Sequence, residues 1–338
     1  MTGPSSMPLH RRAALAVTLA VVALAVFPFG GAAHTCTPDP QVGVGGRLLI
    51  PQSSGLARID LPDRMTQTLA VSPSLGVVTS VARSPDGSRL AVARFSRAPW
   101  ENIGGQDILI VDPEGGQPRQ VIERSRAGEL LGSPAWLPDG SLVFERQSVA
   151  GPVASSRVER QSLDGADSRA LVERGAFPAV SPDGIQLAFI RAEGTERLLI
   201  TDLNGGPERV LADDPLFLSL AFPRFSPDGS WIAFSAASDP SVALTPHAPS
   251  LRLGRGGEGV RAALAHGIPW DIWLVRPDGS ERRRLTYFYD DDPAAAWSPD
   301  GRWLAILSGE ALHVVAVDGP ANFCIAASGG YGGLEWLP

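Results

Sequence analysis

Ser226-Pro227-Asp228-Gly229, followed by Ile232-Ala233-Phe234, is the stretch that decides the fold of this 338-residue chain, because copies of it recur along the sequence. Complete Ser-Pro-Asp-Gly copies also begin at Ser84, Ser181 and Ser298, and a near copy begins at Leu137. Proline presets φ for a tight turn, aspartate bonds to the local backbone, and glycine takes the positive-φ position. The tetrapeptide therefore predicts a chain reversal between two strands.

Short apolar runs surround each turn at the spacing of β-strands. The run after the turn alternates like a half-buried strand, as in Leu187-Ala188-Phe189. Another apolar run follows, and a Gly-rich turn leads to a segment such as Arg209-Val210-Leu211. The turn prolines are 53, 44, 45 and 72 residues apart. Four strands in a period of roughly 40–50 residues are typical of a propeller blade, so we expect an all-β, β-propeller fold.

The two ends of the chain complement each other. Residues 334–338 repeat the start of a blade and stop where Asp-Gly would follow, whereas residues 46–50 and 59–69 repeat the rest of a blade. We therefore predict six four-stranded blades, of which the last combines an inner C-terminal strand with three outer N-terminal strands. Such closure removes open sheet edges. The alternative is an open array of five blades with frayed ends.

Residues 1–33 have the pattern of a secretory signal peptide. Arg11 and Arg12 precede an apolar run over 13–27, and small residues end at Ala33. An uncleaved membrane anchor is the alternative, although the run is shorter than the ~20 apolar residues of a membrane span. We expect an extracytoplasmic protein, either periplasmic or secreted, with a lead at 34–44 and a propeller over 45–338.

The repeat resembles that of TolB-type propellers, a WD-like family. The shared elements are the Ser-Pro-Asp-Gly turn, the Leu-Ala-Phe strand, the Asp-Ile strand and the Gly-Gly-x-x-Arg-x-Leu segment. The resemblance implies six blades. In that family the propeller contacts an envelope lipoprotein and follows an α/β domain. Because only residues 34–44 separate the expected cleavage site from the first strand, we expect this chain to lack that domain.

The basic residues exclude one class of partner, and the cysteines predict a disulfide. All 29 basic residues are arginine, the formal net charge is −7, and no arginine-dense stretch is interleaved with aromatic residues. We therefore expect no nucleic-acid partner. Two cysteines in an exported chain predict one disulfide, Cys36–Cys324, which would tie the lead to the outer strand of the fifth blade. Two free thiols are the alternative.

The candidate binding residues lie on the face opposite the Ser-Pro-Asp-Gly turns. The longest interval contains a Pro-, Gly- and Arg-rich insertion loop at 237–268, and a shorter excursion spans 96–105. Acidic segments between blades, beside aromatic residues, are expected near the mouth of the central channel. The candidates are Trp100, Asp213, Asp214, Arg252, Arg255, Tyr289, Asp290, Asp291 and Asp292. Converging carboxylates would suit Ca²⁺ or a basic peptide, and solvated loop acids are the alternative.

No catalytic residue is nominated. The sequence has no Gly-x-Ser-x-Gly elbow and only 5 histidines. Our hypothesis is an exported, non-catalytic module that binds a protein or peptide through the loop-rich face. We expect no cofactor other than Ca²⁺, and no membrane contact apart from an uncleaved N-terminal anchor. The alternative is a carbohydrate- or peptide-active enzyme, or a ligand sensor, with its site at the channel mouth.

Overall fold

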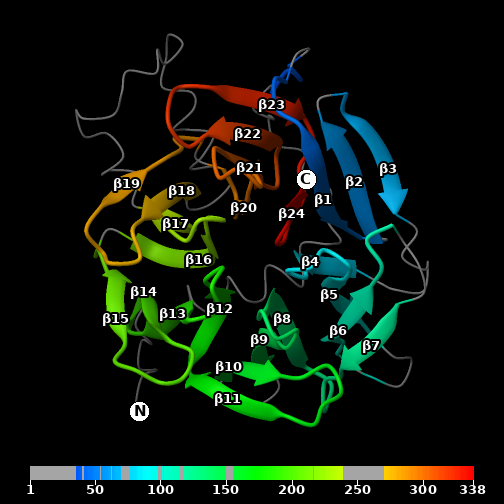
Figure 1. Ribbon diagram of the computed structural model, residues 1–338, viewed down its shortest axis with the longest axis vertical. Coiled ribbons are helices and arrows are strands. Elements are labelled where there is room, and N and C mark those ends of the chain that lie inside the picture. The colour runs from blue at the N-terminus through cyan, green and yellow to red at the C-terminus, as the bar shows by residue number, and fades with distance from the viewer. Residues whose placement is uncertain are drawn as a thin grey trace, which may run out of the picture.

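The protein is a ring of six antiparallel sheets. The computed structural model describes residues 36–39, 42–53, 55–61, 63–69, 77–97, 101, 103–114, 118–149, 155–215, 217–238, 270–288 and 290–338. In these ranges the regular structure consists of β-strands, and they form six four-stranded sheets around a centre (Figure 1). No helix of the described residues is long and apolar enough to cross a membrane. The predicted all-β, six-bladed propeller is confirmed.

Five blades are continuous in sequence and run from the innermost strand outward. Blade 1 is β4 (Val77–Arg83), β5 (Leu90–Ser96), β6 (Gly105–Val111) and β7 (Arg119–Ile122). Blade 2 is β8 (Glu129–Trp136), β9 (Leu142–Ser148), β10 (Ser155–Gln161) and β11 (Ser168–Glu173). Blade 3 is β12 (Gly175–Val180), β13 (Gln186–Glu193), β14 (Thr195–Asp202) and β15 (Arg209–Ala212). Blade 4 is β16 (Phe217–Phe225), β17 (Ile232–Ser238), β18 (Trp270–Val275) and β19 (Arg282–Arg284). Blade 5 is β20 (Ala294–Trp297), β21 (Trp303–Leu307), β22 (Leu312–Ala316) and β23 (Asn322–Ala326).

Blade 6 closes the ring from both ends of the chain, as predicted. Its order is β24 (Glu335–Leu337), β1 (Gly46–Gln52), β2 (Gly55–Leu61) and β3 (Met65–Leu69). The strand β24 also joins blade 1 through the residues that precede it. The Val81 N–H donates to the Gly333 carbonyl over 3.0 Å, and the Gly333 N–H donates to the Thr79 carbonyl over 3.1 Å. These bonds rule out the open five-blade alternative.

The Ser-Pro-Asp-Gly turns are built by hydrogen bonds within each turn. In blade 4 the Ser226 hydroxyl donates to Asp228 over 2.6 Å and accepts the Trp231 N–H over 2.9 Å. The Ser230 N–H donates to the same carboxylate over 3.0 Å, and these bonds lower the pKa of Asp228. Gly229 has a φ of 71°, which glycine adopts without strain. The repeated aspartate is therefore a structural residue of the turn.

Apolar side chains of adjacent blades fill the body of the ring. Phe144, Phe189 and Phe234 occupy equivalent places in the second strands of blades 2, 3 and 4, and all three are fully buried. Burying such a side chain stabilises the fold by about 1.5–3 kcal/mol. The same strand pattern that predicted the blade therefore also supplies its core.

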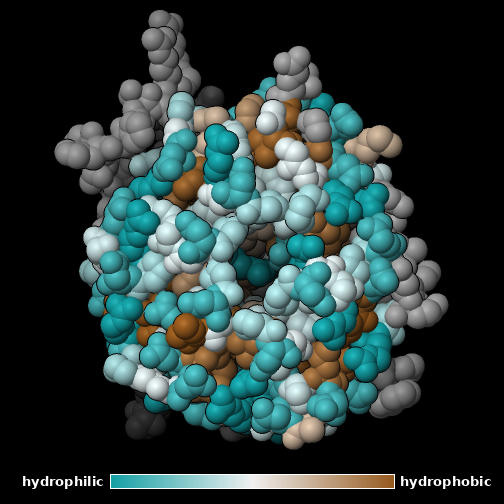
Figure 2. Space-filling model, viewed as in Figure 1, coloured by the Kyte–Doolittle hydropathy of each residue, from teal (hydrophilic) through white to brown (hydrophobic). Residues whose placement is uncertain are grey.

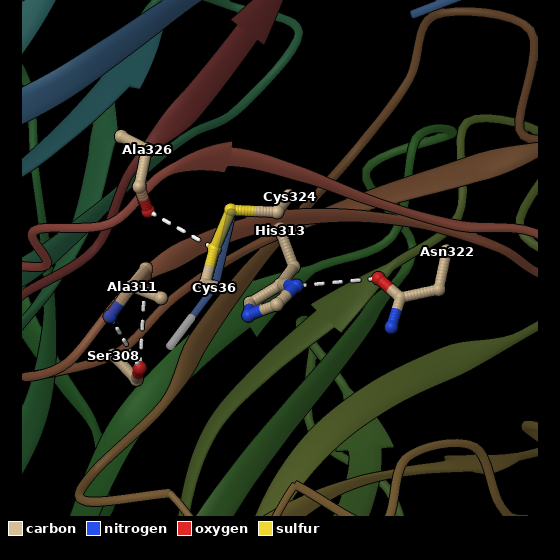
Figure 3. The surroundings of a disulfide bond; sticks show 7 residues. All are labelled: Cys36, Ser308, Ala311, His313, Asn322, Cys324 and Ala326. Atoms are coloured by element: carbon tan, nitrogen blue, oxygen red, sulfur yellow. Dashed lines mark hydrogen bonds between the residues drawn. A yellow bond between two sulfur atoms is a disulfide. The ribbon is translucent and has the colours of Figure 1, made fainter. Parts of the chain in front are cut away.

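A disulfide joins Cys36 to Cys324 in β23 (Figure 3). Their Cα atoms lie 5.8 Å apart, and the Asp39 N–H donates to the Cys324 carbonyl over 2.9 Å. The predicted pairing is confirmed, and the N-terminal lead runs beside the outer strand of blade 5. The bond ties together segments separated by 288 residues, which restricts the unfolded chain strongly.

Candidate functional site

Three segments meet on the face opposite the Ser-Pro-Asp-Gly turns. They are the link between blades 4 and 5 at Asp291, the β21–β22 loop at Gly309, and the approach to β24 at Tyr331. The Gly309 N–H donates to the Asp291 carbonyl over 3.2 Å, and the Tyr331 hydroxyl donates to the Asp291 carboxylate over 3.2 Å. A Cβ added at Gly309 would collide with the Tyr331 hydroxyl, so the ring packs directly on this loop. We call Asp291, Asp292, Glu310 and Tyr331 the acidic patch.

The residue before the patch anchors it to blade 4. The Asp290 carbonyl accepts the Trp270 N–H over 3.0 Å at the start of β18. The Ser235 hydroxyl of β17 donates to the carbonyl of Pro293, just beyond the patch. The link between blades is thus held at both ends, and the acids between are presented from a fixed backbone.

The acids of the patch influence one another. Burial raises the pKa of Asp292 to about 7, and the negative charge of Asp291 acts in the same direction. Burial also raises the pKa of Tyr331, and Asp291, Asp292 and Glu310 add to that effect. The charge contribution common to both shifts is that of Asp291, and this negative charge is one that a cation or a basic side chain would offset.

The other predicted acids belong to a different part of the face. Asp213 is exposed, and Asp214 forms an ion pair of 3.1 Å with Arg282 in β19, the outermost strand of blade 4. The described contacts of Asp291 are instead with blade 5 and the approach to β24. Across the described ranges, no group of three or more His, Cys, Asp or Glu side chains is arranged to hold a metal ion.

Four of the candidate binding residues and most of the predicted insertion loop lie outside the described residues. The four are Trp100, Arg252, Arg255 and Tyr289, and the loop is outside from 239 to 268. Its first two positions, 237 and 238, belong to β17. Next to Tyr289, the Phe288 ring packs on His313 with centroids 4.5 Å apart.

Sequence reasoning missed a pocket in the central channel. It is lined by Ser80, Ser133, Pro134, Phe177, Pro178, Phe222, Pro223, Arg224 and Gly333. Figure 2 shows the hollow at the centre of the ring, with hydrophilic atoms at its floor. A signal was present in the sequence, because an x-Pro dipeptide precedes the turn proline by four residues in three successive blades.

The x-Pro dipeptides mark bulges that turn side chains into the channel. The residues before the prolines, Ser133, Phe177 and Phe222, have φ values of 48°, 50° and 50°. Positive φ is uncommon outside glycine and persists where the surrounding structure fixes it. The Phe177 and Phe222 rings meet edge to face with centroids 4.9 Å apart. One side of the channel is thus closed by a fixed aromatic pair.

Arg224 extends from the aromatic side of the channel toward blades 1 and 6. Its guanidinium lies 4.0 Å from the Glu335 carboxylate and donates to the Val81 carbonyl over 3.5 Å. Burial raises the pKa of Glu335, while the charges of Arg224 and Arg83 oppose that rise. Both contacts of Arg224 are long, so the guanidinium is only weakly engaged.

Comparison with known proteins gives the same repeat. The Tol-Pal system protein TolB of Anaeromyxobacter dehalogenans is 31% identical over 182 residues, which cover 52% of this chain and 37% of that protein. The uncharacterized peptidase YuxL of Bacillus subtilis is 31% identical over 146 residues, 39% of this chain and 21% of the peptidase. The aligned stretches are therefore well under two thirds of either relative's length. No family model matches the chain.

A solved structure extends the likeness to most of the ring. TolB from Acinetobacter baumannii superposes with a TM-score of 0.62 at 19% identity, over 87% of this chain and 67% of that one. At this identity the superposition shows the fold alone. Together with the sequence match, it confirms the predicted resemblance. The chain is a six-bladed β-propeller with a TolB-like repeat.

Proposed function

We propose that the chain is an exported, non-catalytic propeller that binds a protein or peptide partner through its loop-rich face. The acidic patch is the observation that carries this proposal. Asp291, Asp292 and Glu310 surround Tyr331, which is partly exposed, and the backbone of the patch is held by two blades. A fixed anionic surface with an aromatic centre suits a basic segment of a partner, because aromatic residues and complementary charge favour recognition.

Export and protein binding are supported by separate observations. The signal-like pattern of residues 1–33 and the Cys36–Cys324 disulfide both suit an oxidising compartment outside the cytoplasm. Similarity to TolB, named as a protein of the Tol-Pal system, favours a role in an assembly with other proteins. Similarity to YuxL, named as an uncharacterized peptidase, covers only 21% of that protein and therefore gives little support to a peptidase activity.

Affinity capture tests the proposed surface. The protein without residues 1–33 is used to capture partners from native envelope extract, alongside an Asp291→Asn/Glu310→Gln variant. We expect the partner to be retained by the unaltered chain and reduced at least several-fold by the variant. Capture should also weaken as salt rises, because exposed charges are screened.

A variant on the opposite face controls for the loss of an exposed negative charge away from the patch. Asp318→Asn removes one negative charge from the turn between β22 and β23, where the side chain is 95% exposed. It should capture the partner as the unaltered protein does. Equal capture by all three proteins would exclude the acidic patch. Deleting 240–266 separately tests the insertion loop, and unchanged capture would remove that loop from the binding surface.

Calcium binding by the loop-rich face is a further proposal. Equilibrium dialysis of the unaltered protein against Ca²⁺ should give one bound ion per chain, which Asp290→Ala/Asp291→Ala/Asp292→Ala would lose. No bound ion in the unaltered protein would contradict it. The partner proposal does not depend on this result.

A further inference from the structure

The channel pocket is a single layer of equivalent positions. In blade 5 the position five residues before the turn proline is Ala294, which does not line the pocket. The same count from Pro85, Pro138, Pro182, Pro227 and Pro338 gives five further residues, Ser80, Ser133, Phe177, Phe222 and Gly333. All five line the pocket. Because the innermost strands share one register, these residues lie at one depth. The layer is aromatic at blades 3 and 4, has serine at blades 1 and 2, and has glycine just before β24 of blade 6.

The polar side of the layer contains an unsatisfied donor. Ser80 is 6% exposed, and its hydroxyl has no hydrogen-bond partner among the described residues. A buried hydroxyl without a partner costs about 1–3 kcal/mol, so a ligand that accepts its hydrogen bond would recover that cost.

Ser80 and Arg224 both lie close against Gly333, at a point where any side chain would be crowded. A Cβ added there would lie 3.2 Å from the Ser80 Cβ and 3.3 Å from the Arg224 Nη2. The missing side chain therefore lets Ser80 and Arg224 line the pocket on either side of one backbone position.

The charges of the pocket favour an anion. Arg224 is the charged residue that lines the pocket, and the Glu335 carboxylate that it faces is also acted on by the positive charge of Arg83. The Arg224 and Glu335 side chains are 27% and 24% exposed, which leaves the pair within reach of a solute. An incoming acid would form charge-assisted hydrogen bonds that the 4.0 Å contact to Glu335 does not provide.

We propose that this pocket binds a carboxylate group, with Arg224 and Ser80 as donors and the Phe177–Phe222 pair in contact with the adjoining apolar part of the ligand. The carboxylate belongs either to a free small acid or to an acidic group of a bound peptide. In the second case the inference rests on the proposed partner-binding function. The pocket lies in the channel and is separate from the acidic patch.

Titration calorimetry with phenylacetate tests the site. We expect saturable binding to the unaltered protein and at least tenfold weaker binding of phenylacetamide, which lacks the charge. Arg224→Gln should weaken phenylacetate binding by about tenfold or more, since hydrogen bonds to charged groups contribute about 1.5–3 kcal/mol. Gly333→Ala should weaken it by crowding Ser80 and Arg224.

Glu335→Gln is a second variant, which tests the proposal even if Arg224→Gln fails to fold. Removing the competing carboxylate should tighten phenylacetate binding several-fold, whereas a purely structural ion pair predicts no gain. Absence of saturable phenylacetate binding to the unaltered protein would overturn the proposal. Equal binding of phenylacetamide, or a Glu335→Gln variant that binds no tighter, would also overturn it.

Two blocked peptides identify the source of the carboxylate. Acetyl-Gly-Glu-Phe-amide offers only a side-chain acid, and acetyl-Gly-Gln-Phe offers only a terminal acid. Binding of either peptide, lost in Arg224→Gln, assigns the site to peptides, whereas binding of phenylacetate alone assigns it to small acids. If the protein binds phenylacetate but captures no partner, the pocket proposal stands and the proposed partner-binding function is contradicted.

Discussion

Folding shifts the pKa of the turn aspartates and the pKa of the carboxylates buried between strands in opposite directions. Asp228 stands in an open turn, where two serine hydroxyls and a backbone N–H lower its pKa. Asp271 in β18 also accepts hydrogen bonds, from Thr286 over 2.9 Å, from the Phe288 N–H over 2.8 Å and from Arg284. Burial nevertheless raises the pKa of Asp271 to about 6. The number of hydrogen bonds is similar at the two sites, so burial decides the direction of the shift.

The acids of this propeller therefore form two groups, one in the turns and one between the strands. Turn aspartates are in their ordinary ionised state and organise the local backbone. Interior carboxylates such as Asp271 and Glu145 link strands or blades at the cost of desolvation. Substitutions should therefore differ in size, and their pH dependence should differ in sign.

Asp271→Ala should have the largest effect. The substitution leaves Arg284, whose side chain is 9% exposed, without its ion-pair partner Asp271 in the blade. Breaking a buried pair from one side costs about 3–5 kcal/mol of unfolding free energy. Urea denaturation at neutral pH measures the change. Asp271→Asn keeps one acceptor oxygen, Oδ1, for Thr286 and Phe288 and should lose less. A loss below about 1 kcal/mol in Asp271→Ala would contradict a structural role for the pair.

Removing the charge of an acid that is stabilised in the fold lowers stability, whereas Glu145→Gln should raise the free energy of unfolding at neutral pH and above. The Glu145 carboxylate accepts the Phe177 N–H over 3.1 Å, and burial raises its pKa from 4.5 to about 7. Because the folded pKa exceeds the unfolded one, the unaltered protein loses stability as pH rises from 4.5 to about 7. The variant should lack this loss and be more stable above pH 7, by on the order of 3 kcal/mol.

Thermal unfolding across this pH range measures the difference. Glu123→Gln, at an exposed position after β7, is the matched control and should follow the unaltered protein. Parallel pH profiles for Glu145→Gln and the unaltered protein would show that Glu145 does not titrate as the burial implies.

Asp228→Ala should have a moderate effect. It removes the acceptor for Ser226 and Ser230 in the turn, and one such hydrogen bond is worth about 0.5–1.5 kcal/mol. Because the folded pKa lies below the ordinary value of 3.8, this contribution is present above pH 3.8 and is lost as pH falls further. Urea denaturation at neutral and acidic pH measures it. A difference that grows on acidification would contradict the sign.

The six-bladed ring and its closure could be predicted from the sequence, because short local segments specify the turns, the strands and the core residues. Each Ser-Pro-Asp-Gly turn carries its own hydrogen bonds, and the alternating strands carry their own core residues. The ends of the chain repeat complementary parts of one blade, so the pairing of Leu48 with Trp336 was implied by the repeat itself. The partner of Cys36 followed because the chain has only 2 cysteines.

The sites are harder to predict because they join blades that are distant in sequence. Asp291 was a candidate, but Tyr331 sits in a glycine-rich approach that carried no functional pattern. Arg224 and Glu335 meet only because the ring brings blades 4 and 6 to one channel. The x-Pro dipeptides were the local sign of that channel, since in blades 2, 3 and 4 the proline marks where the inner strand bulges.

Asp318→Asn should have the smallest effect and isolates the role of burial. Asp318 pairs with Arg283 over 3.1 Å, and its side chain is 95% exposed. Exposed ion pairs contribute about 0–1 kcal/mol, because water and salt screen the charges. We expect a loss within about 0.5 kcal/mol by urea denaturation, declining further as salt rises. Asp271 and Asp318 each pair with an arginine of β19. A loss at Asp318 as large as that at Asp271 would therefore show that the ion pair, rather than burial, sets the cost.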